Sequence, residues 1–182
     1  WVKYGATEAT QYTAENCVVM SHTKIECITT QGVGANLYWT VSIAGQETAG
    51  TSIVSSYAAP TLDPLNPATY PTDGGIQIEV TGTNLGTFQK PVITFGDTTL
   101  NSTDIILGGR NDLLFFYLPE GKGTNKAVQL NVGGQLTNTV MFNYEAPQIL
   151  SVHSVASDTP GEVQIIILGR SFSTAPVVVM TN

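Results

Sequence analysis

The side chains able to carry chemistry in this sequence are two histidines, two cysteines and scattered carboxylates. His22 and His153 occupy polar turns far apart in the chain, and neither has a Gly-x-Ser-x-Gly nucleophile motif nearby. Most aspartates adjoin Gly, Pro or Asn, where an Asp side chain caps a turn by bonding to its own backbone; these are Asp63, Asp73, Asp97, Asp104, Asp112 and Asp158. We therefore expect solvent-facing histidines, turn-capping aspartates and a protein that is not an enzyme.

The same side chains do not predict a metal or cofactor site. Two cysteines are too few for a four-ligand zinc site, and the absence of a C-x-x-C pair argues against redox chemistry. Asp63 and Glu145 offer oxygen ligands for Ca²⁺ between two domains, but no EF-hand-like spacing accompanies them. Residues 108–111 lack the strand-turn-helix context of a phosphate-binding loop and are expected to form a hairpin loop. We expect no cofactor and no metal.

The composition indicates the cellular compartment of the protein and excludes some classes of partner. Only 12% of the 182 residues are charged, about half the usual share, so Thr, Ser, Asn, Gln and Gly must keep the surface hydrated. Such a surface suits the cell exterior, and a net charge of −7 repels nucleic acid. No apolar run approaches the ~18 residues that cross a bilayer. We expect an extracellular or cell-surface protein with no nucleic-acid partner and no membrane segment in this sequence.

The sequence contains an internal repeat. Tyr-Ala-Ala-Pro ending at Pro60 recurs as Tyr-Glu-Ala-Pro ending at Pro147, a separation of 147 − 60 = 87 residues. In the other direction, the segments around residues 25–27, 32–34 and 45–46 match those around 114–116, 121–123 and 134–135, at 114 − 25 = 89. We therefore divide the chain into the C-terminal part of one repeat (1–57), a complete repeat (58–145) and the N-terminal part of the next (146–182).

The apolar residues of each repeat are spaced by two, which is typical of short strands with one buried face. Turn-forming pairs such as Gly108-Gly109 and Gly133-Gly134 separate these strands at close intervals. No stretch shows ten residues of helical periodicity. We predict an all-β chain of tandem immunoglobulin-like β-sandwiches, one complete and two partial. The predicted core of the complete one is Ile78, Val80, Phe95, Leu114, Phe116, Leu130 and Phe142.

Five blocks in order make the complete repeat resemble an IPT/TIG domain, the immunoglobulin-like domain of plexins and certain transcription factors. The blocks are Ala59-Pro60, Gly74-Gly75, Ile76-x-Ile78-x-Val80-x-Gly82-x-Asn84-Leu85, Val92-x-Thr94-x-Gly96 and Val132-Gly133-Gly134. The resemblance implies a non-catalytic immunoglobulin-like fold. Gly82 follows a buried strand, where a bulge or a close backbone approach would exclude a Cβ.

Two modifications are expected. Cys17 and Cys27 align with the apolar strand positions Ile106 and Phe116, where two free thiols would serve as small hydrophobes. Cysteine-bearing members of the resembling family place a pair here, which implies a disulfide. Asn101 opens the chain's N-x-[ST] sequon in a polar turn, so a glycan is expected there after passage through a eukaryotic secretory route.

Three functions compete. The first is a structural or adhesive extracellular repeat protein that forms a rod or filament, with copies of itself or adjacent repeats as head-to-tail partners and glycans on its surface. The second is a spacer in the ectodomain of a plexin-like cell-surface receptor. The third is an accessory module of a secreted carbohydrate-active enzyme, which needs an exposed Trp platform, and only Trp1 and Trp39 are available. Repetition without catalytic chemistry favours the first, and Pro60 and Pro147 are expected to stiffen the junctions between repeats.

Overall fold

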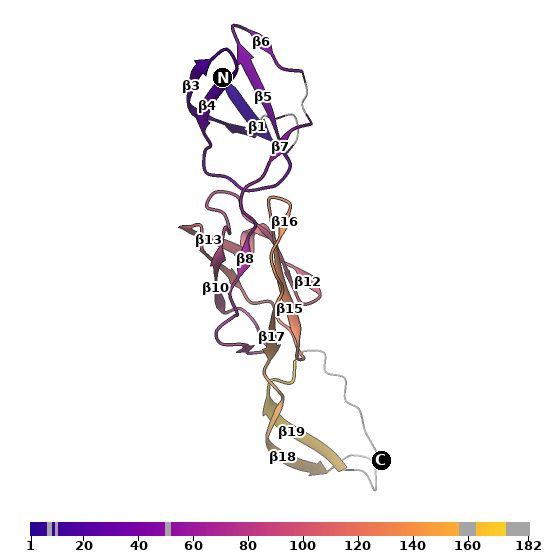
Figure 1. Cartoon of the computed structure of the whole chain (residues 1–182). Coiled ribbons are helices and arrows are strands. Elements are labelled where there is room, and N and C mark those ends of the chain that lie inside the picture. The colour runs from indigo at the N-terminus through magenta and orange to yellow at the C-terminus, as the bar shows by residue number, and fades with distance from the viewer. Residues whose placement is uncertain (7–8, 10, 50–51, 157–162, 174–182) are drawn as a thin grey trace.

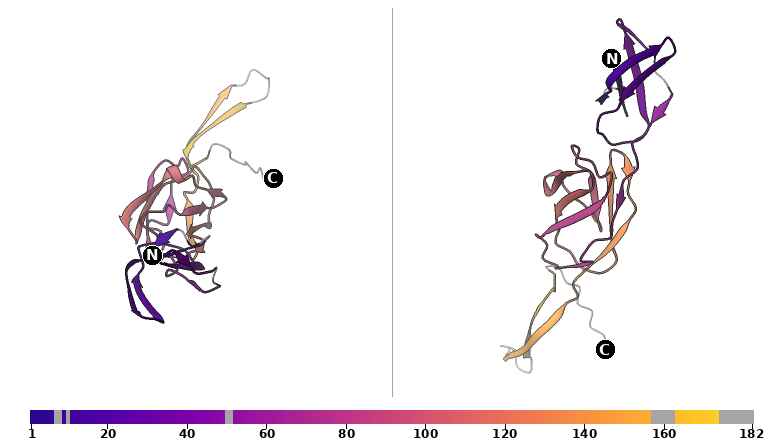
Figure 2. Two further views of the ribbon diagram at one scale, coloured as in Figure 1. Left: turned by 90° about the horizontal axis from the view of Figure 1, so that it is seen from above. Right: turned by 60° about the vertical axis from the view of Figure 1, so that its left-hand side comes forward.

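The chain is built almost wholly from β-strands, as predicted (Figure 1). The computed structural model describes residues 1–6, 9, 11–49, 52–156 and 163–173. Across those ranges there is no α-helix, and a 3₁₀ turn spans Ser102–Asp104. Figure 1 shows three bodies in series along one long axis, and the turned views of Figure 2 keep them separate. The predicted all-β, immunoglobulin-like fold class is confirmed, whereas the number of tandem repeats stays a prediction.

The described residues of the N-terminal body form seven strands. They are β1 (Val2–Gly5), β2 (Tyr12–Thr13), β3 (Glu15–Ser21), β4 (Lys24–Ile28), β5 (Leu37–Ile43), β6 (Gln46–Glu47) and β7 (Val54–Ser55). One sheet has the order β2-β1-β5-β6, with β7 also paired to β5, whereas β3 and β4 form a separate hairpin. The fully buried core of this body is small, because it consists of Val2, Tyr4, Ala14 and Leu37.

The central body is a two-layer sandwich. Its strands are β8 (Thr61–Leu62), β9 (Thr69–Tyr70), β10 (Gln77–Thr83), β11 (Val92–Phe95), β12 (Thr98–Thr99), β13 (Ile105–Arg110), β14 (Leu113–Tyr117), β15 (Lys126–Val132), β16 (Gln135–Leu136) and β17 (Val140–Tyr144). One layer has the order β13-β14-β10-β8. The other has the order β12-β11-β15-β17-β9, with β16 paired to β15. All pairs are antiparallel except β9 with β17, which run parallel.

The core of the sandwich lies between the two layers. Successive side chains of β10 alternate between exposed and buried, as the spacing of two requires. All seven residues of the predicted core are buried, so that prediction is confirmed. Phe95 contacts the opposite layer, since its ring centroid lies 5.2 Å from that of Phe116, and within its own layer it lies 3.9 Å from that of Phe142.

The third body is a hairpin of β18 (Gln148–Ala156) and β19 (Val163–Arg170). Its register matches that of the central body one repeat earlier. Ile149 faces Gly169 in the hairpin as Leu62 faces Gly82 in the sandwich, and both residues of the pair are displaced by 149 − 62 = 87 positions. A Cβ on Gly82 would overlap the carbonyl oxygen of Thr61, and a Cβ on Gly169 would overlap that of Gln148. The close approach predicted at Gly82 is thus confirmed.

The N-terminal body contains counterparts of the later strands of the sandwich. The bounds of β4 and β14 differ by 113 − 24 = 89 residues, and those of β5 and β15 by 126 − 37 = 89. The short strands β6 and β16 are separated by the same distance. β4, β5 and β6 therefore follow one another along the chain as β14, β15 and β16 do in the sandwich. The predicted boundaries after residues 57 and 145 remain a prediction.

Candidate functional site

A side chain from the loop before β5 packs into the junction between the N-terminal and central bodies. Val33 belongs to the loop of the N-terminal body, yet it is buried within the hydrophobic cluster of the central sandwich. A Cβ on Gly133 would lie 2.7 Å from Val33 Cγ2 and 2.9 Å from the Gly34 nitrogen. Gly133 also has a φ of +59°, so it is the residue that both the β15–β16 turn and the incoming loop require. The two bodies therefore share a core.

Hydrogen bonds fasten the same junction. The Tyr57 N–H donates to the Gly34 carbonyl at 2.9 Å, which ties the last segment of the N-terminal body to its loop. From the central body, Gln135 Nε2 donates to the Tyr57 carbonyl at 3.2 Å. Pro60, which follows Tyr57 after two alanines, is buried. A packed valine, a bonded linker and a buried proline therefore all lie at this junction.

A cluster of tyrosines holds the loop that carries Val33. Tyr12 Oη donates to the Val33 carbonyl at 2.9 Å and accepts from the Val33 N–H at 3.1 Å. Tyr57 Oη donates to the Thr30 carbonyl at 2.5 Å and bonds to Tyr4 Oη at 2.6 Å. Burial, followed by the hydrogen bond with Tyr4, raises the pKa of Tyr57 well above its usual value. The Tyr57 hydroxyl therefore stays protonated, and its bonds to Thr30 and Tyr4 hold this loop in place.

A groove of about 780 Å³ runs beside the junction, with walls from both bodies. Its lining includes the amides Gln31, Asn84 and Asn111, the ion pair Arg110–Asp112 and the ring of Phe88, which is 80% exposed. The hydrogen bond from Arg110 lowers the pKa of the Asp112 carboxyl. Among these lining residues no nucleophile lies beside a general base. The groove can therefore offer hydrogen bonds and the aromatic rings of Tyr57 and Phe88.

The disulfide between Cys17 and Cys27 is present. It joins β3 to β4 and so staples a hairpin that hydrogen-bonds to no other strand among the described residues. Cys27 is half-buried against the small core of the N-terminal body. The disulfide that the resemblance implied is thereby confirmed, and the alternative of two free thiols is wrong.

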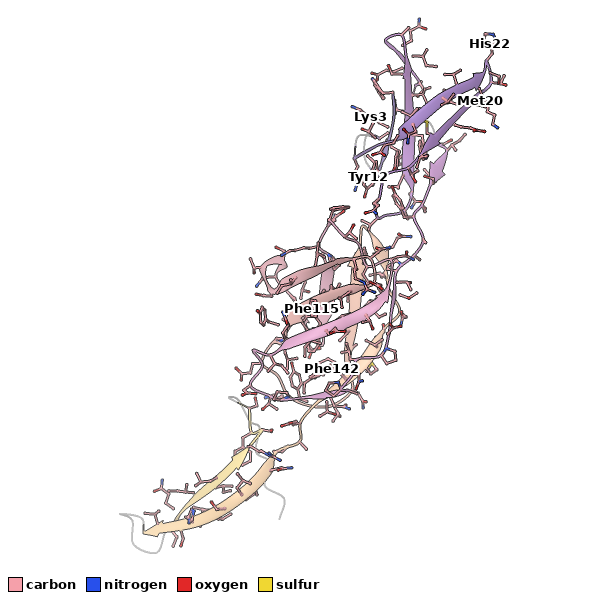
Figure 3. The ribbon with its side chains drawn as sticks, turned by 90° about the vertical axis from the view of Figure 1, so that its left-hand side faces the viewer. Lys3, Tyr12, Met20, His22, Phe115 and Phe142 are labelled. Carbon is pink, nitrogen blue, oxygen red and sulfur yellow. A yellow bond between two sulfur atoms is a disulfide. The ribbon has the colours of Figure 1, made fainter. Side chains whose placement is uncertain are left out.

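Both histidines are exposed, as predicted, but His153 lies inside β18 rather than in a turn, and Asp158 lies outside the described residues. Figure 3 shows His22 at the outer tip of the β3–β4 hairpin. Asp63 accepts a hydrogen bond from Thr81, whereas Glu145 accepts one from Ser171. Within the described part of the chain, no three His, Cys, Asp or Glu side chains gather as metal ligands. The described residues also contain no helix that could span a membrane.

Asn101 is exposed immediately before the 3₁₀ turn. Ser102 and Thr103 of its sequon are exposed as well, and Lys90 Nζ donates to the Ser102 carbonyl at 2.6 Å. The carboxamide is therefore accessible to a modifying enzyme. The glycan itself stays a prediction.

The insertion of Val33 was missed in the sequence. Its tripeptide Gly32-Val33-Gly34 aligns with Gly121-Lys122-Gly123 one repeat later. An apolar residue between two glycines in one copy, where the other copy has lysine, is the signal that could have found it. The pattern contains no information, however, about the glycine that receives the valine in the next domain.

Comparison with known proteins places the central body in a family. Residues 60–144 match the model of the IPT/TIG domain, which confirms the predicted resemblance over the sandwich. Among solved structures, the chain is similar to the plexin A4 full extracellular region, with 16% identity and a TM-score of 0.42. The match covers 78% of this chain and 14% of that one. No curated protein sequence matches the chain.

Proposed function

Because residues 60–144 form an IPT/TIG domain, we propose that the chain is a non-catalytic structural module of an extracellular rod whose repeats associate head to tail. Domains of this immunoglobulin-like type are modules that supply shape and surfaces. The observation that carries the proposal is the packed junction, in which Val33 of one body completes the core of the next. A tandem array with such junctions transmits orientation from repeat to repeat.

Two further observations support the extracellular setting. A disulfide persists in oxidising compartments and is rare in the reducing cytosol, and Cys17 is bonded to Cys27. The surface has few charges and many hydroxyl and amide side chains, which suits a protein that is hydrated without strong fields. Glycans on exposed sites such as Asn101 would add to that hydration.

The two different ends of the molecule support a head-to-tail arrangement. Figure 1 places the N-terminal body and the β18–β19 hairpin at opposite ends of the long axis. A contact between two different surfaces is heterologous, and repeated heterologous contacts build an open filament unless the rotation happens to close a ring. The partners are therefore further repeats or further copies of the chain.

Small-angle X-ray scattering and sedimentation velocity test the proposal together. We expect the scattering of the dilute protein to fit a rod, and the sedimentation coefficient to increase with protein concentration. A globular or flexible-bead profile would contradict the rod. A rod that remains monomeric over the whole concentration range would contradict self-association and favour the receptor-spacer alternative, which needs stiffness only.

A further inference from the structure

One layer of the central sandwich has an outward face without charge. This layer contains β11, β15, β17 and β9, and none of the outward residues of these four strands is acidic or basic. All four strands lie within residues 60–144, so the face belongs to a body in which both layers are present. The larger outward side chains are Val92, Thr94, Gln129, Asn131, Met141 and Asn143.

The opposite layer presents a different outward face. Glu79 points outward from β10, and Asp63, which follows β8, accepts a hydrogen bond from Thr81 on the same face. Among the described outward residues of β8, β10 and β14, no basic side chain balances these carboxylates. Two copies of that face brought together would set carboxylate against carboxylate, which is repulsive.

Each kind of group on the uncharged face can pair with the same kind of group on a second copy. Hydroxyls and side-chain amides carry both a hydrogen-bond donor and an acceptor, whereas a carboxylate only accepts. Val92 is 53% exposed and Met141 is 49% exposed, so they add apolar area. The centres of protein–protein interfaces are depleted in charge and enriched in methionine. The uncharged face is therefore suited to a contact with itself.

The amides on this face are oriented by internal hydrogen bonds that use only part of each group. Gln129 Nε2 donates to the Thr137 carbonyl at 2.9 Å, and within the described residues the Gln129 side-chain oxygen has no further partner. Asn131 and Asn143 each accept a backbone N–H with their side-chain oxygens, at 2.8 Å. Their amino groups have no partner in the described part of the chain. The face thus offers one oriented acceptor and two oriented donors.

We propose that this uncharged face is a lateral contact between two copies of the chain, related by a two-fold axis. A second copy is the occupant because the net charge of −7 makes two copies repel each other, and here no carboxylate meets another. The contact is isologous, since the same surface serves on both molecules, and it therefore closes at a pair. It uses a different surface from the head-to-tail association and does not depend on it.

The strand register places Gln129 at the centre of the face. Val92 on β11 lies opposite Asn131, two residues after Gln129 on β15. Met141 on β17 lies opposite Ala127, two residues before Gln129. Val92 and Met141 therefore flank Gln129 on opposite sides and in opposite directions along β15. A two-fold axis over Gln129 that exchanges these two positions sets Gln129 against Gln129 and Val92 against Met141 of the second copy.

A single cysteine at the axis tests the contact. Gln129→Cys is made in the full chain, whose native cysteines are already bonded to each other. We expect a homodimer under mild oxidation, because the two thiols meet at the axis. Glu79→Cys on the outward face of the other layer is the control. Glu79 is exposed whereas Gln129 is half-buried, so random collision would favour the control, and faster linking by Gln129→Cys would show the contact.

Two further cysteine variants test the direction of the axis. Val92→Cys and Met141→Cys are oxidised separately and as a mixture. We expect the mixture to form a heterodimer in which mass spectrometry finds peptides joined through positions 92 and 141. Either variant linking to itself in preference to the mixed link would overturn the proposed axis.

A pair of threonine substitutions tests the absence of charge. Thr94 lies directly opposite Gln129, so Thr94→Lys would bring two ammonium groups close to the axis. Thr81→Lys places the same charge beside Asp63 on the other face. We expect Thr94→Lys to weaken lateral association about tenfold and Thr81→Lys to leave it nearly unchanged. Both variants change the net charge by the same amount, so a general change in repulsion would affect them equally.

The outcomes separate this inference from the head-to-tail rod. A Gln129→Cys protein that stays monomeric under oxidation, or links no faster than Glu79→Cys, would overturn the lateral contact and leave the rod standing. Assembly that stops at a pair and is weakened by Thr94→Lys would support the lateral contact and contradict head-to-tail growth, which has no such limit. Growth beyond a pair that Thr94→Lys leaves unchanged would support the rod and overturn the lateral contact.

Discussion

Tyr144 donates a hydrogen bond from its hydroxyl to the backbone carbonyl of Pro119, at 2.8 Å. One repeat earlier, Tyr57 makes the same bond to Thr30, the counterpart of Pro119 at 119 − 30 = 89 positions. The backbone hydrogen bonds of the two tyrosines are equivalent as well. The Tyr144 N–H donates to the Gly123 carbonyl, and the Tyr57 N–H donates to the Gly34 carbonyl. A tyrosine thus closes each repeat at the point where the chain leaves it.

The buried tyrosine predicts a loss of stability at alkaline pH. Burial raises the pKa of Tyr144 from 10.0 to about 12. A raised pKa in the folded state means that this contribution to stability is complete below pH 10.0 and is lost as the pH rises through about 12. We expect the free energy of unfolding to fall across that window. Urea titrations followed by circular dichroism measure it.

The matched variants for this prediction are Tyr144→Phe and Tyr117→Phe. Tyr144→Phe removes the titrating hydroxyl together with its bond to Pro119, so it should reduce the alkaline fall, to which the raised pKa values of Tyr57 and Tyr70 also contribute, while lowering stability at neutral pH. Tyr117 is exposed on β14, and its replacement should leave the fall intact. An unchanged alkaline fall in Tyr144→Phe would show that another group causes it.

Truncating a core aromatic should unfold the sandwich more easily. Phe116 is fully buried between the layers, and Phe116→Ala should cost about 3 to 5 kcal/mol of stability because it leaves a cavity. Phe115 is the neighbouring residue of the same type and is only half-buried, so Phe115→Ala should cost distinctly less. Equal losses would contradict the observed alternation along β14. Circular dichroism is the appropriate measurement, since both tryptophans lie in the N-terminal body.

Reducing the disulfide should destabilise the N-terminal body alone. The bond between Cys17 and Cys27 closes a loop with a sequence separation of 10, and the chain-entropy estimate gives about 3 kcal/mol for such a loop. Tryptophan fluorescence reports only the N-terminal body, because the chain has Trp1 and Trp39 and no others. We expect reduction to shift the fluorescence transition and to leave the transition of the central sandwich in place. A Cys17→Ser/Cys27→Ser variant should behave like the reduced protein.

Polar substitution of Val33 should loosen the rod. Val33→Ser removes the apolar group that fills the core cluster at the junction, whereas Val18→Ser makes the same change at a position of β3 that is 56% exposed. We expect the first variant to broaden the distribution of maximum dimensions in small-angle scattering and the second to match the unmodified protein. If the two variants scattered alike, the junction would not depend on Val33.

Expression through a eukaryotic secretory pathway should attach a glycan to Asn101. The side chain is exposed next to a short turn, and the expected observation is a mass that falls after treatment with an N-glycosidase. Thr103→Ala abolishes the sequon while keeping the asparagine, so that variant should show no change. Mass loss in the variant would place the glycan elsewhere.

Periodicity and the repeat were enough to predict the sandwich, its core and the glycine at position 82, because each depends on a rule that acts within one repeat. Ile78 and Val80 are two residues apart on one strand, and Gly82 recurs as Gly169. The junction could not be predicted this way. Val33 packs against Gly86 and Gly133, which belong to another body, and only the folded arrangement brings these three residues together.

The hydrogen-bonded network of tyrosine hydroxyls could not be predicted from the sequence either. Tyr4, Tyr12 and Tyr57 lie on separate segments of the N-terminal body, and their convergence on Thr30 and Val33 depends on the path of the loop. A tyrosine in an alternating strand is equally consistent with a buried ring and an exposed one. The repeated Tyr-x-Ala-Pro motif indicated a boundary between repeats but not the bond that secures it.

The parallel pairing of β9 with β17 determines how the central sandwich would respond to tension. The chain enters this body near Pro60 and leaves it after Tyr144, so a pull on its neighbours draws the start of β9 and the end of β17 in opposite directions. Parallel strands pulled in this sense slide along each other, and the bonds from Asn143 N–H to the Ala68 carbonyl and from Glu145 N–H to the Tyr70 carbonyl are loaded together. Strands pulled apart from one end would instead lose their bonds in succession. The body is therefore arranged to bear force along its axis in shear.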